Sequence, residues 1–176
     1  MKKYFLLTMI IFLILSCSTQ EDIIVPIEKI TDSGKELSLE NFKLVGFKKS
    51  KEYNVEDLPG ALSAYFGFVK NDLGEPEDYE IRFYSSHQDA VQLGSNYADN
   101  ITGEDACIKK DCSLWTENLN QRIHLEGGRN NTWNGTPDTK YMNYVIYNNL
   151  ILLCPGYNVE DALLNCTEMV NRINNQ

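Results

Sequence analysis

Two histidines are the side chains of this chain whose ordinary pKa lies near neutral pH, and both have polar neighbours. His87 lies in the segment Ser85-Ser86-His87-Gln88-Asp89. Its imidazole, with hydroxyls and the exposed amides of a helix start, could bind an anion or a metal, although the same residues also cap helices without any further role. His124 lies in Arg122-Ile123-His124-Leu125-Glu126, whose alternation predicts a strand with one exposed polar face. Of the two histidines, we therefore take only His87 as a ligand-binding candidate.

A long polar loop, Gly127 to Asp138, carries two further ligand-binding candidates, Arg129 and Trp133. Long loops in compact domains often carry function. An exposed indole among amides and hydroxyls could stack on a sugar ring or anchor a protein partner. The alternative is that Trp133 folds back against the edge of the core. The second tryptophan, Trp115, is flanked by leucines and is expected in the core.

Four cysteines follow Cys17, namely Cys107, Cys112, Cys154 and Cys166. An even number in an exported chain predicts two disulfides, and three pairings are possible. We favour Cys107–Cys112 and Cys154–Cys166 because each closes a short local loop. Four thiolates could instead ligate one zinc ion, but no Cys-x-x-Cys spacing occurs, so the sequence predicts neither a metal nor another cofactor.

Motifs of common enzyme classes do not occur in the sequence. There is no Gly-x-Ser-x-Gly, no glycine-rich phosphate loop and no His-Glu-x-x-His. Carboxylates are plentiful, 25 Asp and Glu against 16 Lys and Arg, and none stands out as an acid–base pair. The sequence therefore favours a binding or accessory module. The alternatives are an envelope enzyme, hydrolytic or thiol-based, that uses His87 or an unpaired cysteine, and a structural envelope spacer.

The N-terminus has the pattern of an export signal. Lys2 and Lys3 precede an apolar run from Tyr4 to Leu15, and small residues follow at Ser16-Cys17-Ser18. The run is about a dozen residues, whereas a membrane span needs roughly 20. The stretch Leu13-Ile14-Leu15-Ser16-Cys17 resembles the lipobox of bacterial lipoproteins. The resemblance implies that Cys17 is lipidated and becomes the mature N-terminus, and that Ser18 directs the protein to the outer membrane in cells that have one. The alternative is an ordinary secreted protein cut near Ser18.

Three segments follow from this pattern: a signal peptide at 1–16, a lipidated tether at 17–38 and a globular domain at 39–176. The formal charge is −9, and removal of Lys2 and Lys3 with the signal makes it −11. So acidic a chain is a poor partner for nucleic acid or for an anionic lipid surface. The expected partners are the membrane, through the lipid, and an envelope protein or small ligand.

The domain reads as three strand–helix units. We predict a strand at 42–47 and a helix that opens at Asn54 and runs to about Val69, because apolar residues recur there at helical spacing. A strand at 79–84 and a helix at 87–101 form the second unit. A hairpin of 141–147 and 150–154, with the second strand central, and a final helix form the third. The tether holds one candidate edge strand, at 23–27. We expect a single α+β domain with an antiparallel or mixed sheet, about three helices packed mainly on one face, and two disulfides.

The pentapeptide Tyr-Asn-Val-Glu-Asp occurs twice, at 53–57 and at 157–161. Each copy is expected to follow a strand and to open a helix. The asparagine would cap the helix, the two acids would lie in the first turn, and the tyrosine would pack back as a staple. We interpret the repeat as a helix start and not as a catalytic motif.

Overall fold

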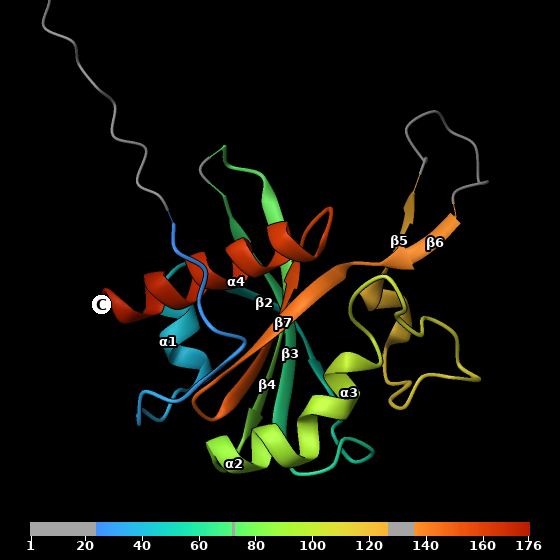
Figure 1. Ribbon diagram of the computed structural model, residues 1–176, viewed down its shortest axis with the longest axis horizontal. Coiled ribbons are helices and arrows are strands. Elements are labelled where there is room, and N and C mark those ends of the chain that lie inside the picture. Colours follow the sequence, from blue (N-terminus) through green and yellow to red (C-terminus); the bar gives the residue numbers. More distant parts are fainter. Residues whose placement is uncertain (1–23, 72, 127–135) are drawn as a thin grey trace, which may run out of the picture.

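The computed structural model describes residues 24–71, 73–126 and 136–176, which form one α+β domain (Figure 1). A six-stranded mixed sheet has the order β1-β7-β8-β4-β3-β2, and only the β1–β7 pair is parallel. Its strands are β1 Ile30–Thr31, β2 Lys48–Tyr53, β3 Ala61–Lys70, β4 Pro76–Tyr84, β7 Tyr141–Tyr147 and β8 Leu150–Pro155. A separate antiparallel ribbon pairs β5 Ile123–Glu126 with β6 Thr136–Thr139. The predicted fold class is confirmed.

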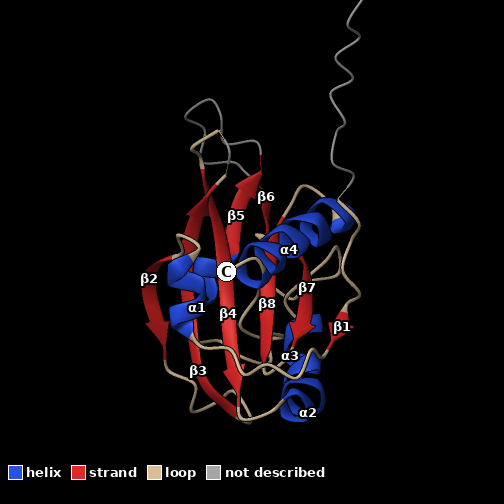
Figure 2. Cartoon of the chain, turned by 90° about the vertical axis from the view of Figure 1, so that its left-hand side faces the viewer, coloured by secondary structure: helices blue, strands red, loops and turns tan. Residues whose placement is uncertain are grey.

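The helices lie on both faces of the sheet instead of mainly on one. Helices α1 (Leu39–Leu44) and α4 (Val159–Asn174) lie side by side against one face (Figure 2). The opposite face is covered by a continuous helical stretch and by the following segment, 100–122. That stretch consists of α2 His87–Asp89, the π-helical η1 Ala90–Gly94 and α3 Ser95–Asp99, and a 3₁₀ turn, η2 Leu119–Arg122, ends the segment.

The β7–β8 hairpin forms as predicted, and β8 is buried on both faces. Its side chains alternate between the two cores: Leu152 faces α4, and Ile151 and Leu153 face α3. The turn uses Asn148 at φ 53°, a left-handed conformation that asparagine tolerates. Asn149 also joins the hairpin turn to the segment before α1, since its Oδ1 accepts a hydrogen bond of 2.8 Å from the amide of Leu37.

Part of the segment assigned to the tether is bound to the sheet. The edge strand is at Ile30–Thr31, beside β7, and the described part of the expected strand, 24–27, has no strand structure. The amide of Ile27 donates to Thr167 Oγ1 of α4 at 3.0 Å, and Leu37 is buried in the core. The ordered domain therefore includes residues before Leu39.

Two predictions near the start of the domain are wrong. Residues 39–44 form helix α1, where a strand was expected from Phe42. At the start of this helix the amide of Ser38 donates to Asn41 Oδ1, and Gly46, at φ +93°, follows the end of the helix. Residues 61–70 form strand β3 where a helix was expected. The apolar spacing of 58–69 fitted a helix, but Gly60 at φ +72° breaks the helical backbone. The pairing of β3 with β2 on one side and β4 on the other outweighs the local helical preference of these residues.

The two copies of the repeated pentapeptide differ in structure. Asn158 caps α4, and its Oδ1 accepts hydrogen bonds of 2.9 Å from the amides of Glu160 and Asp161. Asn54 instead closes a turn after β2, with one such bond from Glu56. The expected tyrosine staple is wrong at the second copy, because Tyr157 is 99% exposed. The repeat is therefore an asparagine cap that serves a helix in one place and a turn in the other.

We expect Asn158→Ala to lower the free energy of unfolding by about 1 kcal/mol, the usual cost of a lost N-cap, and to reduce helical circular dichroism. Asn54→Ala is the matched control, since it removes the same side chain from a turn. It should leave the helical signal unchanged. Equal loss of helical signal in both variants would contradict the difference between the two sites.

Candidate functional site

An open cleft of about 740 Å³ lies at the end of the sheet where β4 begins and β8 ends. Volumes of this size are usual for ligand sites. Figure 1 shows the β5–β6 ribbon at this end of the molecule and α2 at the opposite end. The cleft is lined by Asn71, Glu75, Pro76, Glu77, Asp78, His124, Asp138, Lys140, Met142, Pro155, Gly156, Tyr157, Asp161, Leu164 and Asn165.

Tight turns hold two walls of the cleft in place. In the turn between β3 and β4, Asn71 Oδ1 accepts from the amides of Leu73 and Glu75, which fixes the start of β4. On the other side, the chain passes from β8 into α4 at Gly156, where a Cβ atom would come within 2.4 Å of the amide nitrogen of Ala162. A glycine is therefore required at this close approach.

The cleft is strongly acidic. Its lining holds five carboxylates against one lysine, a net charge of −4 with histidine neutral. Lys140 pairs with Asp78 at 2.7 Å, so one carboxylate is neutralised directly. The surroundings therefore favour a positively charged ligand over an anionic one.

The rim of the cleft also offers apolar surface. Tyr157 is almost fully exposed, and Leu164 is 38% exposed on the adjacent turn of α4. An exposed phenol ring beside carboxylates can receive a cation on its face and apolar groups at its edge.

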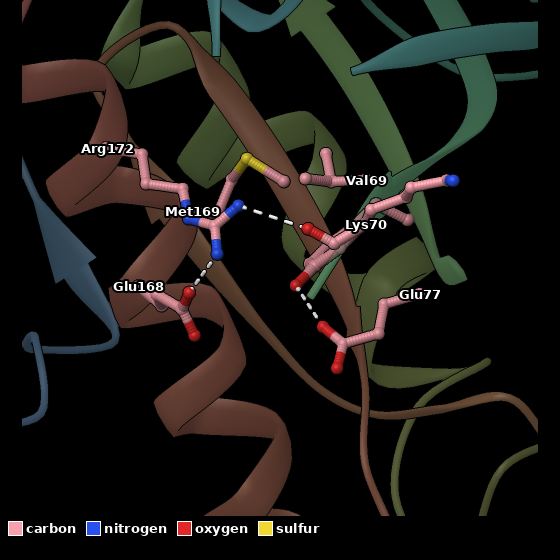
Figure 3. A pocket seen from close by; sticks show the side chains of 7 residues that line it. Val69, Lys70, Glu77, Glu168, Met169 and Arg172 are labelled. Atoms are coloured by element: carbon pink, nitrogen blue, oxygen red, sulfur yellow. Dashed lines mark hydrogen bonds and ion pairs between the residues drawn. The ribbon is translucent and has the colours of Figure 1, made fainter. Parts of the chain in front are cut away.

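A second hollow, between α4 and the β3–β4 pair, is filled by its own side chains (Figure 3). Arg172 lies across it, pairing with Glu168 and donating to the carbonyl oxygen of Lys70 at 3.4 Å. The hollow leaves no room for a water-sized ligand. We interpret it as a packed contact between helix and sheet.

A charged cluster is buried between the sheet and the segment 100–122. Glu80 (0% exposed) binds the Nε atoms of Arg82 and Arg122 (both 1% exposed) at 2.7 Å each. Burial opposes ionisation of Glu80, but the two guanidinium groups outweigh burial and hold the pKa of this carboxyl below its ordinary value. Both guanidinium groups lie against the ring of Trp115, at 5.1 and 4.1 Å from its centroid.

Three tyrosines surround this cluster on the same face of the sheet. Burial is the main cause that raises the pKa of each phenol: that of Tyr84 reaches about 12, and those of Tyr53 and Tyr141 lie well above the ordinary value. These phenols therefore stay neutral and keep their protons at physiological pH.

Of the three ligand-binding candidates that the sequence offered, the structure describes His87. His87 begins α2, at the far end from the cleft, and its Nδ1 lies 2.8 Å from the carbonyl oxygen of Asn148. Because a carbonyl only accepts, Nδ1 carries the proton, and the histidine ties α2 to the hairpin turn. Ser86 caps the same helix through a bond of 3.0 Å from the amide of Asp89. Cys17, Arg129 and Trp133 lie outside the described residues.

The strand segment around His124 differs from its prediction in one respect. His124 is exposed on β5 and lines the cleft. Arg122, expected on the same exposed face, is buried against Glu80, because the 3₁₀ turn before β5 directs it into the core. Trp115 is in the core, as expected.

The structure pairs Cys107 with Cys112 and Cys154 with Cys166, the two local pairings that the sequence favours. The second disulfide joins β8 to α4, and the first lies in the segment that covers the buried cluster. Within the described ranges, no three His, Cys, Asp or Glu side chains gather as a metal site, and none of the helices has the length and apolar character of a membrane span.

A family model matches residues 38–175, which is most of the chain and includes every wall of the cleft. The chain belongs to the DUF6810 family. This family is described as one of unknown function. The search of curated proteins and that of solved structures gave no match. The function of this DUF6810 domain is therefore argued from its own residues.

Sequence reasoning missed the cleft. Its residues are spread over strand ends, the start of α4 and turns that read as ordinary connections, such as 71–75 and 156–157. One signal was available: the run Glu75-Pro76-Glu77-Asp78 places three acids beside a strand start. These acids indicate a binding site only together with the residues of β6 and α4, which line the same cleft in the folded chain.

We expect Glu80→Gln to lower the free energy of unfolding at pH 7 by about 3–5 kcal/mol, because two buried arginines lose their counterion. The folded pKa of Glu80 is depressed, so its stabilising contribution is present above its unfolded pKa, near 4.5, and is lost as pH falls through the folded pKa. Denaturant unfolding between pH 3 and pH 7 should show a flatter acid dependence in this variant. Glu75→Gln, at an exposed position, should change stability by less than about 0.5 kcal/mol; equal effects of the two changes would contradict the assignment.

Proposed function

We propose that this DUF6810 protein is a lipid-anchored protein of the cell envelope that acts by binding a ligand in the acidic cleft. The observation that carries the binding role is the cleft itself, which combines a volume of about 740 Å³, a net negative lining and an exposed tyrosine.

The location rests on the cysteines and on the N-terminus. Two disulfides indicate an oxidising compartment outside the cytoplasm. The lipobox-like stretch before Cys17 supports lipid anchoring, with the outer membrane or the cell surface as the destination. An anchored domain acts on partners within reach of the membrane, and a binding module is suited to that position.

The ligand we infer carries at least one positive charge and an apolar portion. A cationic group would be attracted by the carboxylates of Glu75, Glu77 and Asp138, and an apolar portion would contact Tyr157 and Leu164. An envelope protein with an exposed lysine-rich segment and a small organic amine both have this chemistry.

The enzyme hypotheses receive less support. A thiol-based mechanism needs an unpaired cysteine, and the four described cysteines are all in disulfides. A hydrolytic mechanism through His87 needs a nucleophile held at its Nε2, because Nδ1 is engaged by the Asn148 carbonyl, and among the described residues no hydrogen bond joins a side chain to that nitrogen. A passive spacer would have no use for an exposed aromatic ring at the rim of a cleft.

Lipid anchoring predicts that Cys17→Ser abolishes membrane attachment. The wild-type protein should fractionate with membranes and show a mature mass that begins at Cys17 with added diacylglyceryl and acyl groups. Reduction should add about 4 Da, two hydrogens for each disulfide. A wild-type chain recovered in the soluble fraction and starting near Thr19 would contradict the anchor.

Binding in the cleft predicts measurable affinity for spermidine and for tetralysine, and none for tetraglutamate, in isothermal titration calorimetry of the mature protein. Affinity for the cations should fall as salt is raised, because exposed charges are screened. Glu75→Gln and Tyr157→Ala should each weaken binding about threefold or more, for a lost contact of roughly 0.7 kcal/mol or greater. Glu104→Gln, an exposed acid outside the cleft, is the control. Equal weakening by Glu75→Gln and Glu104→Gln would show a general charge effect and contradict a cleft site.

A further inference from the structure

The buried cluster around Glu80 has more hydrogen-bond donors than acceptors. Each arginine uses its Nε on Glu80, and Arg122 also donates from Nη1 to the carbonyl oxygen of Trp115 at 3.2 Å. Six other polar atoms in or around the cluster are buried and have no partner among the described residues: Arg82 Nη1, Arg122 Nη2, Trp115 Nε1 and the hydroxyls of Tyr53, Tyr84 and Tyr141.

These donors belong to one compact group. Tyr53 packs edge-on against Trp115, with ring centroids 5.7 Å apart. The Arg122 guanidinium lies 5.2 Å from the Tyr53 centroid and 4.1 Å from that of Trp115. Arg82 shares Trp115 and Glu80 with Arg122, so the two guanidinium groups flank the same ring and the same carboxylate.

The group also carries an uncompensated positive charge. Two arginines face one glutamate, and all three side chains are buried. Asp78, whose charge acts on Tyr53 and Tyr141, is itself paired with Lys140. A net buried charge is costly unless it is paired.

Water satisfies this arrangement poorly. A water molecule can accept from the arginine and tryptophan nitrogens and donate to the phenol oxygens, but it is neutral and leaves the excess positive charge in place. A small anion accepts from every one of these groups and removes the excess charge as well.

We propose that the Glu80–Arg82–Arg122 cluster holds one small monovalent anion of the halide class, bound by the free donors of Arg82, Arg122 and the flanking tyrosines. The anion completes the core between the sheet and the segment 100–122. This site is separate from the acidic cleft, and it stands whether or not the cleft binds a ligand.

The direct test is a crystal structure of the mature protein grown in sodium bromide, with data collected at the bromine absorption edge. We expect an anomalous peak within hydrogen-bond distance of Arg82 Nη1 or Arg122 Nη2. Ordered water alone at that place would overturn the proposal.

A solution test uses mass action, because an anion that binds only the folded state raises the unfolding midpoint. The midpoint of the wild-type protein should rise as chloride replaces gluconate at constant ionic strength. The double variant Tyr53→Phe with Tyr141→Phe, which keeps the rings and both arginines, should lose about half of that rise or more. Tyr147→Phe is the matched control, since its phenol hydroxyl donates to Asn174 on the other face of the sheet. A chloride response that is absent from the wild-type protein, or equal in the double variant and the control, would contradict the site.

Discussion

The ion pairs between Glu80 and its two arginines are the interaction on which the rest of this structure depends. Arg82 is a neighbour on the same strand, but Arg122 comes from 42 positions further along the chain and reaches the same carboxylate. Burying these charges without pairing them would cost several kcal/mol. The segment 100–122 must therefore return to one place on the sheet, which it then covers with Trp115 and Leu119.

The cleft follows from that constraint. Asp78, which lines the cleft, lies two residues before Glu80 and so shares the same face of β4. The carbonyl oxygen of Arg122 accepts a hydrogen bond of 2.8 Å from the amide of Lys140, and Lys140 in turn pairs with Asp78. Because η2 runs directly into β5, the position of Arg122 also sets where the β5–β6 ribbon leaves the sheet. The buried cluster thus places one wall of the site.

The sequence predicted the elements whose signals are local. The β7–β8 hairpin has an Asn-Asn turn between apolar runs, α4 has an asparagine cap and a buried stripe, and both disulfides close short loops. The errors arose where distant partners decide the outcome. Strand β3 has helical apolar spacing, and only its pairing with β2 and β4 makes it a strand.

Arg122 shows a similar limit for the candidate site. Arg122 lies in a segment where polar and apolar residues alternate, a pattern that predicts an exposed side chain. Its counterion Glu80 lies at a polar position of the same kind of alternation on β4, and yet both side chains are buried. Each charge becomes plausible in the core only when the other is known to face it. The cleft could not be predicted for the same reason, because its walls come from segments far apart in the sequence, 71–78, 138–142 and 155–165 together with His124.

The central claim is that the acidic end of the domain is its binding surface. Backbone-amide nuclear magnetic resonance spectra of the mature protein, carrying Cys17→Ser to keep it free of lipid, would test the claim most directly during titration with spermidine. The account predicts saturable shifts confined to residues 73–78, 138–142 and 155–165. Shifts centred on α2 and His87, or no saturable shift anywhere, would contradict it.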